Sequence, residues 1–269
     1  MAGFKGLTVG RTLRWHRGLL WLAASALVLW GGSGLLHPLM VASGPQPVTM
    51  MPPPVSVDGS AWQGLTRALH GQGQIERVKW VASDTGPLLQ LSLPADPVRQ
   101  YWNANGEALP AATDRNQAIW LARHFTGRDD AVIATELLTA FDARYPAVNR
   151  QLPVWRIAFD GDDGTVAYIH TETATLAALT DSNKEVLQTA FRWFHTMSWL
   201  GDLTPLKLGL GSIWVGALLV TTLLGVLLLT RFRRRETKPL QRWHRRLAWL
   251  VVVPLMAMTL SGLHHLWQA

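Results

Sequence analysis

Charged residues are missing from three long stretches of the chain. Residues 18–57, 208–230 and 247–269 contain no Lys, Arg, Asp or Glu and are rich in apolar side chains. About 20 consecutive apolar residues suffice to cross the hydrocarbon core of a bilayer. The pattern therefore predicts three transmembrane helices, over residues 18–40, 207–230 and 247–268.

The first apolar stretch also has features of a signal peptide, because basic residues precede an apolar core. Three observations favour a retained helix instead. The core is too long for a signal peptide, it contains Trp21 and Trp30, and its sequence recurs near the C-terminus, where no signal could act.

Between the first two apolar stretches the hydrophobic pattern changes to short segments separated by turns. Apolar residues at helical spacing predict helices over 58–69, 116–125 and 131–141. Short apolar runs beside Gly, Asn and Asp turns predict strands over 77–80, 88–93, 98–102, 152–160, 166–170 and 176–179. Two helix-plus-sheet units in tandem define an α+β domain. A Pro-rich spacer, residues 41–57, precedes it and is expected to lift it off the membrane.

The charges are distributed unevenly and predict the orientation. Four cations precede the first helix and eight lie between the second and third. Residues 41–190 carry 11 Lys and Arg against 16 Asp and Glu, a net charge of −5, while the rest carries 14 against 2, a net of +12. Cytoplasmic loops are enriched in cations. The N-terminus is therefore expected inside, and the α+β domain and the C-terminus outside. The overall charge of +7 reflects topology and does not indicate nucleic-acid binding.

The expected organisation follows from these patterns. It comprises a cytoplasmic N-terminus (1–17), a first transmembrane helix (18–40), the Pro-rich spacer (41–57), the outer α+β domain (58–190), the second transmembrane helix with its lead-in (191–230), a basic cytoplasmic loop (231–246) and the third transmembrane helix (247–269). The chain has no cysteine, which excludes disulfides, thiolate-bound zinc, iron–sulfur clusters and covalently attached c-type haem.

One motif occurs twice, at a constant offset of 228 residues. Arg-Trp-His-Arg at 14–17 leads to Ser-Gly-Leu-Leu-His at 33–37, and Arg-Trp-His-Arg at 242–245 leads to Ser-Gly-Leu-His-His at 261–265. Each copy has histidines 21 residues apart, which spans roughly 31 Å of helix and returns to within roughly 60° of the same face. His264 is expected to face about 160° away from His244. The repeat thus predicts one histidine at each membrane surface on two helices.

These histidines suggest b-type haem, whose iron takes two axial imidazoles that two helices can supply. We expect one haem between His16 and His244, and a second between two of His37, His195 and His265, with His264 available to another neighbour. Glycines on the three helices, namely Gly31, Gly32, Gly34, Gly209, Gly211, Gly216 and Gly262, are expected to permit close approach.

Other interpretations remain open. Interfacial histidines can be simple polar anchors, and the outer histidines could bind zinc or copper. His70, His124 and His170 are expected to have surface or core roles, and Asp160, Asp162 and Asp163 to form a solvated turn. The sequence contains no Gly-rich phosphate loop or Rossmann fingerprint, so no flavin or nucleotide site is expected.

A family resemblance rests on four segments. Leu-Pro-Val-Trp-Arg-Ile at 152–157, Tyr-Ile-His at 168–170, Phe-Arg-Trp-Phe-His at 191–195 and the repeated Trp-His-Arg helices resemble the PepSY-associated transmembrane family. The resemblance covers most of the chain. It implies a bacterial inner-membrane protein with two periplasmic PepSY-like units, and some members resemble haem-containing ferric-siderophore reductases. Where the family often has a second histidine, three residues after His195, this chain has Ser198.

Two functions are expected from these observations. The first is an oxidoreductase of the ferric-reductase type that transfers electrons through haem b, from a cytoplasmic or quinol donor to a periplasmic acceptor such as a ferric chelate. The second is a haem-free, membrane-anchored PepSY module whose helices contact membrane lipid and which binds or regulates a periplasmic partner. The sequence leaves open whether three helices suffice or a homodimer completes the site.

Overall fold

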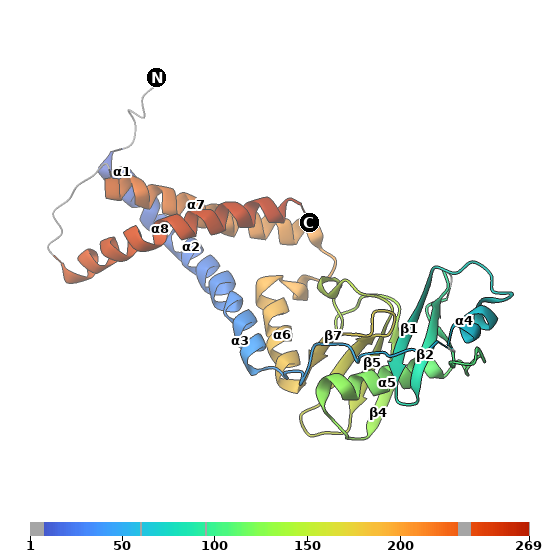
Figure 1. Cartoon of the computed structure of the whole chain (residues 1–269). Helices are drawn as coiled ribbons and strands as arrows, with labels where there is room; N and C mark the ends of the chain where they lie inside the picture. The colour runs from blue at the N-terminus through green and yellow to red at the C-terminus, as the bar shows by residue number, and fades with distance from the viewer. Residues whose placement is uncertain (1–7, 60, 95, 231–237, 269) are drawn as a thin grey trace. The chain divides into compact units, whose positions relative to one another are not determined.

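The computed structural model describes residues 8–59, 61–94, 96–230 and 238–268, with only the backbone for 265 and 266. It divides into two compact units (Figure 1). One comprises Ser43–Val186, and the other comprises Met1–Ala42 with Leu187–Ala269. Part of the predicted basic loop, residues 231–237, lies outside the described residues.

The helical unit confirms the three predicted apolar helices. Candidate membrane spans cover Leu20–Ser43, Thr204–Thr230 and Pro239–His264, and each is long and apolar enough to cross a bilayer. The buried side chains where these helices meet are small or β-branched, including Ala23, Ala26, Val215 and Ala217. Small residues allow helix backbones to approach closely in a membrane.

The first span is not one regular helix. It follows α1 (Val9–Gly18) and consists of α2 (Leu20–Ala26), the π-helical turn η1 (Leu27–Gly32) and α3 (Leu36–Ser43). The other two spans are continuous, α7 (Thr204–Thr230) and α8 (Pro239–Leu266). Helix α7 contacts α1, α2 and α8 and so connects the bundle (Figure 1). Helix α6 (Ser182–His195) and the short η3 (Ser198–Leu200) lead into α7.

The other unit contains two antiparallel sheets in tandem, as predicted. The first sheet, β1 (Arg77–Ser83), β2 (Gly86–Ser92) and β3 (Gln100–Trp102), follows α4 (Ala61–Leu69). The second sheet has the order β4 (Val132–Leu138), β5 (Val154–Phe159), β6 (Val166–His170) and β7 (Thr175–Thr180), and follows α5 (Thr113–Thr126). A short 3₁₀ turn, η2 (Ala147–Asn149), lies between β4 and β5.

The predicted helix over 131–141 was wrong, because this segment forms strand β4. Its β-branched residues Val132, Ile133 and Thr135 favour an extended backbone. Pairing decides the conformation: Thr135 lies opposite Ile157 and Leu137 opposite Trp155 on β5. The apolar spacing suited a helix, but these long-range hydrogen bonds outweighed it.

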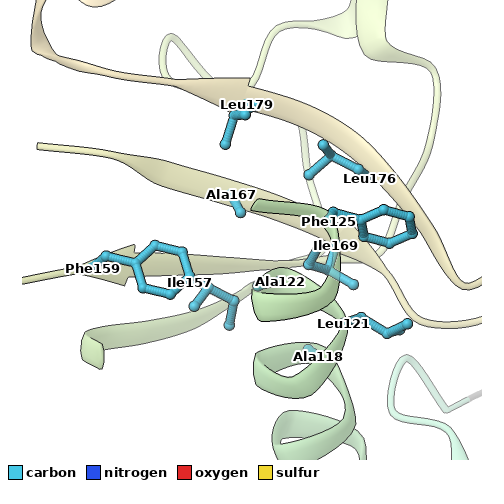
Figure 2. Packing of buried hydrophobic residues seen from close by; sticks show 10 residues of the cluster. All are labelled: Ala118, Leu121, Ala122, Phe125, Ile157, Phe159, Ala167, Ile169, Leu176 and Leu179. Carbon is cyan, nitrogen blue, oxygen red and sulfur yellow. The ribbon is translucent and has the colours of Figure 1, made fainter. Parts of the chain in front are cut away.

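The main core of this unit lies between α5 and the second sheet. Figure 2 shows Leu121 and Phe125 of α5 close to Ile157, Ile169 and neighbouring strand residues. These four named side chains are inaccessible to solvent. A separate cluster packs α4 against the first sheet through Ala68, Leu89, Leu91 and Trp102.

The Pro-rich segment before α4 is extended and contacts α5. Val48 N donates to Phe125 O at 2.9 Å, and His124 Nε2 lies 3.0 Å from Met51 O. A Cβ added to Gly127 would meet Val48 at 3.0 Å. The segment therefore lies against its own domain at these points, and its role in holding that domain away from a membrane stays a prediction.

Candidate histidine sites in the helical unit

His16 lies against α7, which is more than two hundred residues further along the chain. Its Nδ1 is 3.0 Å from the backbone oxygen of Thr221. A Cβ added to Gly225, one helical turn further on, would lie 3.5 Å from His16 Cε1. The glycine thus leaves room for the imidazole ring beside the helix.

The partner of His16 fixes which ring nitrogen carries the proton. A backbone carbonyl can only accept, so Nδ1 must donate. In a neutral imidazole Nε2 then has a free lone pair. Metal-bound histidines are held in the same way, with the second ring nitrogen donating to a carbonyl or carboxylate. The buried Thr221 hydroxyl has no hydrogen-bond partner among the described residues.

His195 is held similarly by the first span. Its Nδ1 is 3.0 Å from Ser33 Oγ, and the Ser33 hydroxyl donates to the carbonyl of Leu29. The Ser33 hydroxyl proton is used in the bond to Leu29, so Ser33 Oγ accepts a hydrogen bond from His195 Nδ1. In the neutral imidazole, Nε2 of His195 then keeps a free lone pair. Trp30 Nε1 donates to the His195 carbonyl at 2.9 Å, and the Phe191 ring stacks on the imidazole at 4.5 Å.

The π-helical turn positions these contacts. Trp30 lies within it and Ser33 follows directly. Single π turns within α-helices are frequent at functional sites. Trp30 also packs edge-to-face on Trp214 of α7, with ring centroids 5.7 Å apart. The turn therefore directs one indole toward both α6 and α7.

The remaining predicted histidines are less constrained. His244 is exposed on α8 and interacts electrostatically with His16, so the structure brings these two near one another. His37 and His264 are exposed. The side chain of His265 lies outside the described residues. Among the side chains described, no group of three or more His, Cys, Asp and Glu could hold a metal ion.

The prediction that histidines 21 residues apart lie on nearly the same helix face applies to only one copy of the repeat. The segment between His244 and His265 is continuous α-helix, although it contains Pro254. Between His16 and His37 the α-helix is interrupted at Leu19 and again by the π-helical turn. A π turn contains more residues per turn, so equal spacing in sequence does not give equal facing.

Most of the glycines that we expected at contacts between helices do not lie at such contacts. A Cβ added to Gly32, Gly34, Gly209 or Gly216 would meet no atom within 4 Å. Gly262 fits the expectation best, since its Cβ would lie 3.9 Å from Val215. Composition alone cannot show which side of a helix faces a neighbour.

The other three histidines lie in the α+β unit, and two of them make contacts there. His170 is buried and His124 contacts Met51, whereas His70 is exposed. Asp163 accepts from Arg128 and from Thr165 in the β5–β6 turn, in agreement with the predicted hairpin.

Sequence reasoning missed Ser33, Trp30 and Thr221 as partners of the histidines. A signal existed for the serine, because Ser33 belongs to the repeated Ser-Gly-x-x-His motif and corresponds to Ser261. Nothing local marks Thr221, whose backbone oxygen makes the contact. No family model, curated protein or solved structure matches this chain. The family resemblance therefore stays a prediction.

Proposed function

We propose that this chain is a b-type haem protein of the bacterial inner membrane that transfers electrons to an acceptor outside, with a ferric chelate as the acceptor class. The main support is the hydrogen bonding of His16 and His195. Each directs Nδ1 at an acceptor and keeps Nε2 free to bind a metal. Both imidazoles lie on helices packed against apolar spans. Such apolar surroundings favour binding of the flat, apolar porphyrin ring.

In this proposal each haem has two imidazole ligands. His16 and His244 would hold a haem near the inner surface, and His195 would hold one near the outer surface with His37 or His265. Haem b supplies reversible one-electron transfer. The Thr221 carbonyl and the Ser33 hydroxyl orient the imidazoles and fix their tautomers. Trp30 restrains His195 by binding its backbone oxygen.

The charge distribution supports the direction of transfer. The cations at the ends of the spans favour an orientation with the N-terminus in the cytoplasm and the acidic α+β unit outside. Reducing equivalents would come from a cytoplasmic or quinol donor, since the sequence contains no nucleotide-binding fingerprint. The resemblance to the PepSY-associated transmembrane family points to the same reaction class. In this proposal the α+β unit contributes the surface that meets the acceptor.

The test is the haem content of the full chain, purified in detergent after expression with added haem precursor. We expect a Soret band, and separate α and β bands after reduction. His16→Ala and His244→Ala should each remove the same haem, so the double variant loses no more than either single variant. His195→Ala should remove the other haem and spare the first.

His70→Ala is the matched control, because His70 is an exposed histidine of the α+β unit and should leave haem content unchanged. A colourless wild-type protein that is folded and fully expressed would contradict the proposal. It would favour the alternative, a haem-free membrane-anchored module that binds a partner through its α+β unit.

A further inference from the structure

The two sheets of the α+β unit meet through polar side chains. Gln90 on β2 donates to the carbonyl of Thr171 at 3.0 Å and to Tyr101 Oη at 2.7 Å. The Tyr101 hydroxyl donates to Asp114 Oδ1 at 2.8 Å. All four residues are almost inaccessible to solvent. The junction therefore contains specific, buried hydrogen bonds.

Arg99 and His170 form the part of this junction that can respond to acid. Arg99 Nη2 lies 3.3 Å from His170 Nε2, and these residues are 4% and 7% exposed. A guanidinium can only donate, so Nε2 must accept. Nδ1 then carries the proton and donates to Thr173 Oγ1 at 2.7 Å. This arrangement requires a neutral imidazole.

The charges that face His170 make its protonation unfavourable. In the described part of the chain they are Arg77 and Lys79 on β1, Arg99 before β3, and Glu172 in the β6–β7 turn. Glu172 is already shared, since it pairs with Arg77 and with Arg99 at 3.0 Å each. Three cations thus surround one carboxylate. A charged imidazole would add a fourth cation in a buried place.

We propose that this junction is an acid-sensitive latch between the two sheets. A proton on His170 Nε2 replaces the acceptor with a donor, and the hydrogen bond from Arg99 is lost. The two cations then repel each other, and the first sheet loosens from the β6–β7 turn. The polar interface of the α+β unit thereby becomes accessible when the surrounding medium is acidified.

The direction of the pH dependence follows from the same groups. Burial lowers the pKa of His170 below its ordinary value of 6.5, Arg99 lowers it further, and Glu172 acts in the opposite sense. The unfolded or opened state therefore binds the proton more readily. The closed junction loses stability as pH falls below about 6.5, and the loss ends at the pKa of the closed form.

Glu172 does not titrate in the same window. Burial alone would raise the pKa of Glu172, but the hydrogen bond from Arg99 and the nearby cations hold it below 4.5. The carboxylate thus stays charged between pH 7.5 and 5.5. Glu172 therefore contributes no change in that interval, and the His170→Gln variant separates His170 from the other histidines.

The test is hydrogen exchange of the full chain in detergent at pH 7.5 and 5.5, read by mass spectrometry and corrected for intrinsic exchange rates. Peptides containing 99–102 and 170–173 should lose protection at pH 5.5, by up to about tenfold, because pH 5.5 lies about one unit below the ordinary pKa of a histidine. His170→Gln keeps an acceptor for Arg99 and a donor for Thr173, and it should abolish that loss. His70→Gln should retain it.

A second measurement uses only the wild-type protein and covers the case in which His170→Gln does not fold. Exchange of the imidazole C2 hydrogen gives the titration of each histidine. We expect His170 to titrate below the ordinary histidine pKa of 6.5. Titration of His170 at or above 6.5, or unchanged protection of the two peptides between pH 7.5 and 5.5, would overturn the latch. Neither result depends on haem.

Discussion

At the scale of single residues, Asp114 organises the polar interior of the α+β unit. Tyr101 Oη donates to its Oδ1 at 2.8 Å, and Trp155 Nε1 donates to its Oδ2 at 2.7 Å. The carboxylate is inaccessible to solvent. Asp114→Ala leaves both donors without a partner and should lower the free energy of unfolding by about 2–5 kcal/mol. Chemical denaturation followed by tryptophan fluorescence measures this change.

Asp129→Ala is the control for that loss, because Asp129 is an exposed carboxylate nearby in sequence. Surface substitutions usually change stability by less than about 0.5 kcal/mol. Equal effects of the two variants would show that the hydrogen bonds from Tyr101 and Trp155 to Asp114 do not stabilise the fold.

At the scale of elements, α4 approaches the turn after β3 unusually closely. A Cβ added to Gly64 would collide with the carbonyl of Ala104 and lie 2.9 Å from Gly106 N. Gly106 has φ +82 in this turn, a conformation that favours glycine. Gly64→Ala should therefore push α4 from the first sheet and cost about 1–3 kcal/mol in the free energy of unfolding.

Gly73→Ala offers a matched comparison for the Gly64 variant. A Cβ there would meet no atom within 4 Å, and no unusual backbone angle is involved. Circular dichroism during thermal unfolding should separate the two variants clearly. A Gly64→Ala protein as stable as Gly73→Ala would show that the helix can shift without cost.

At the scale of the whole molecule, the two units contain separate sets of buried side chains. Ile157 is inaccessible in the core of the α+β unit, and Ala26 is inaccessible in the helical unit. Ile157→Ala creates a cavity and should cost about 2–5 kcal/mol. We expect calorimetry of the full chain to show a lowered transition for the α+β unit only.

The reciprocal variant is Ala26→Leu, which overpacks the contact between the first span and its neighbours. It should shift only the transition of the helical unit. If either variant moved both transitions together, the units would unfold as one cooperative body.

Much of the architecture could be predicted from the sequence, because the relevant signals are local. The length of an uncharged apolar stretch determines whether a helix can span a bilayer, and all three stretches form such helices. Turn residues between short apolar runs correctly separated β5 from β6, and the short third strand predicted over 176–179 lies within β7. Strand β6, Val166–His170, has the predicted bounds.

Tertiary structure decided what depends on distant partners. Residues 131–141 have helical spacing, but β5 supplies hydrogen bonds that make Val132–Leu138 a strand. The repeat singled out His16 as a candidate ligand, whereas its orientation comes from a Thr221 carbonyl on another helix. No sequence pattern around His170 indicates that Arg99, 71 residues earlier in the chain, lies beside it. An imidazole's tautomer is set by the atom that its nitrogen meets, and a backbone oxygen on another element leaves no mark in the sequence.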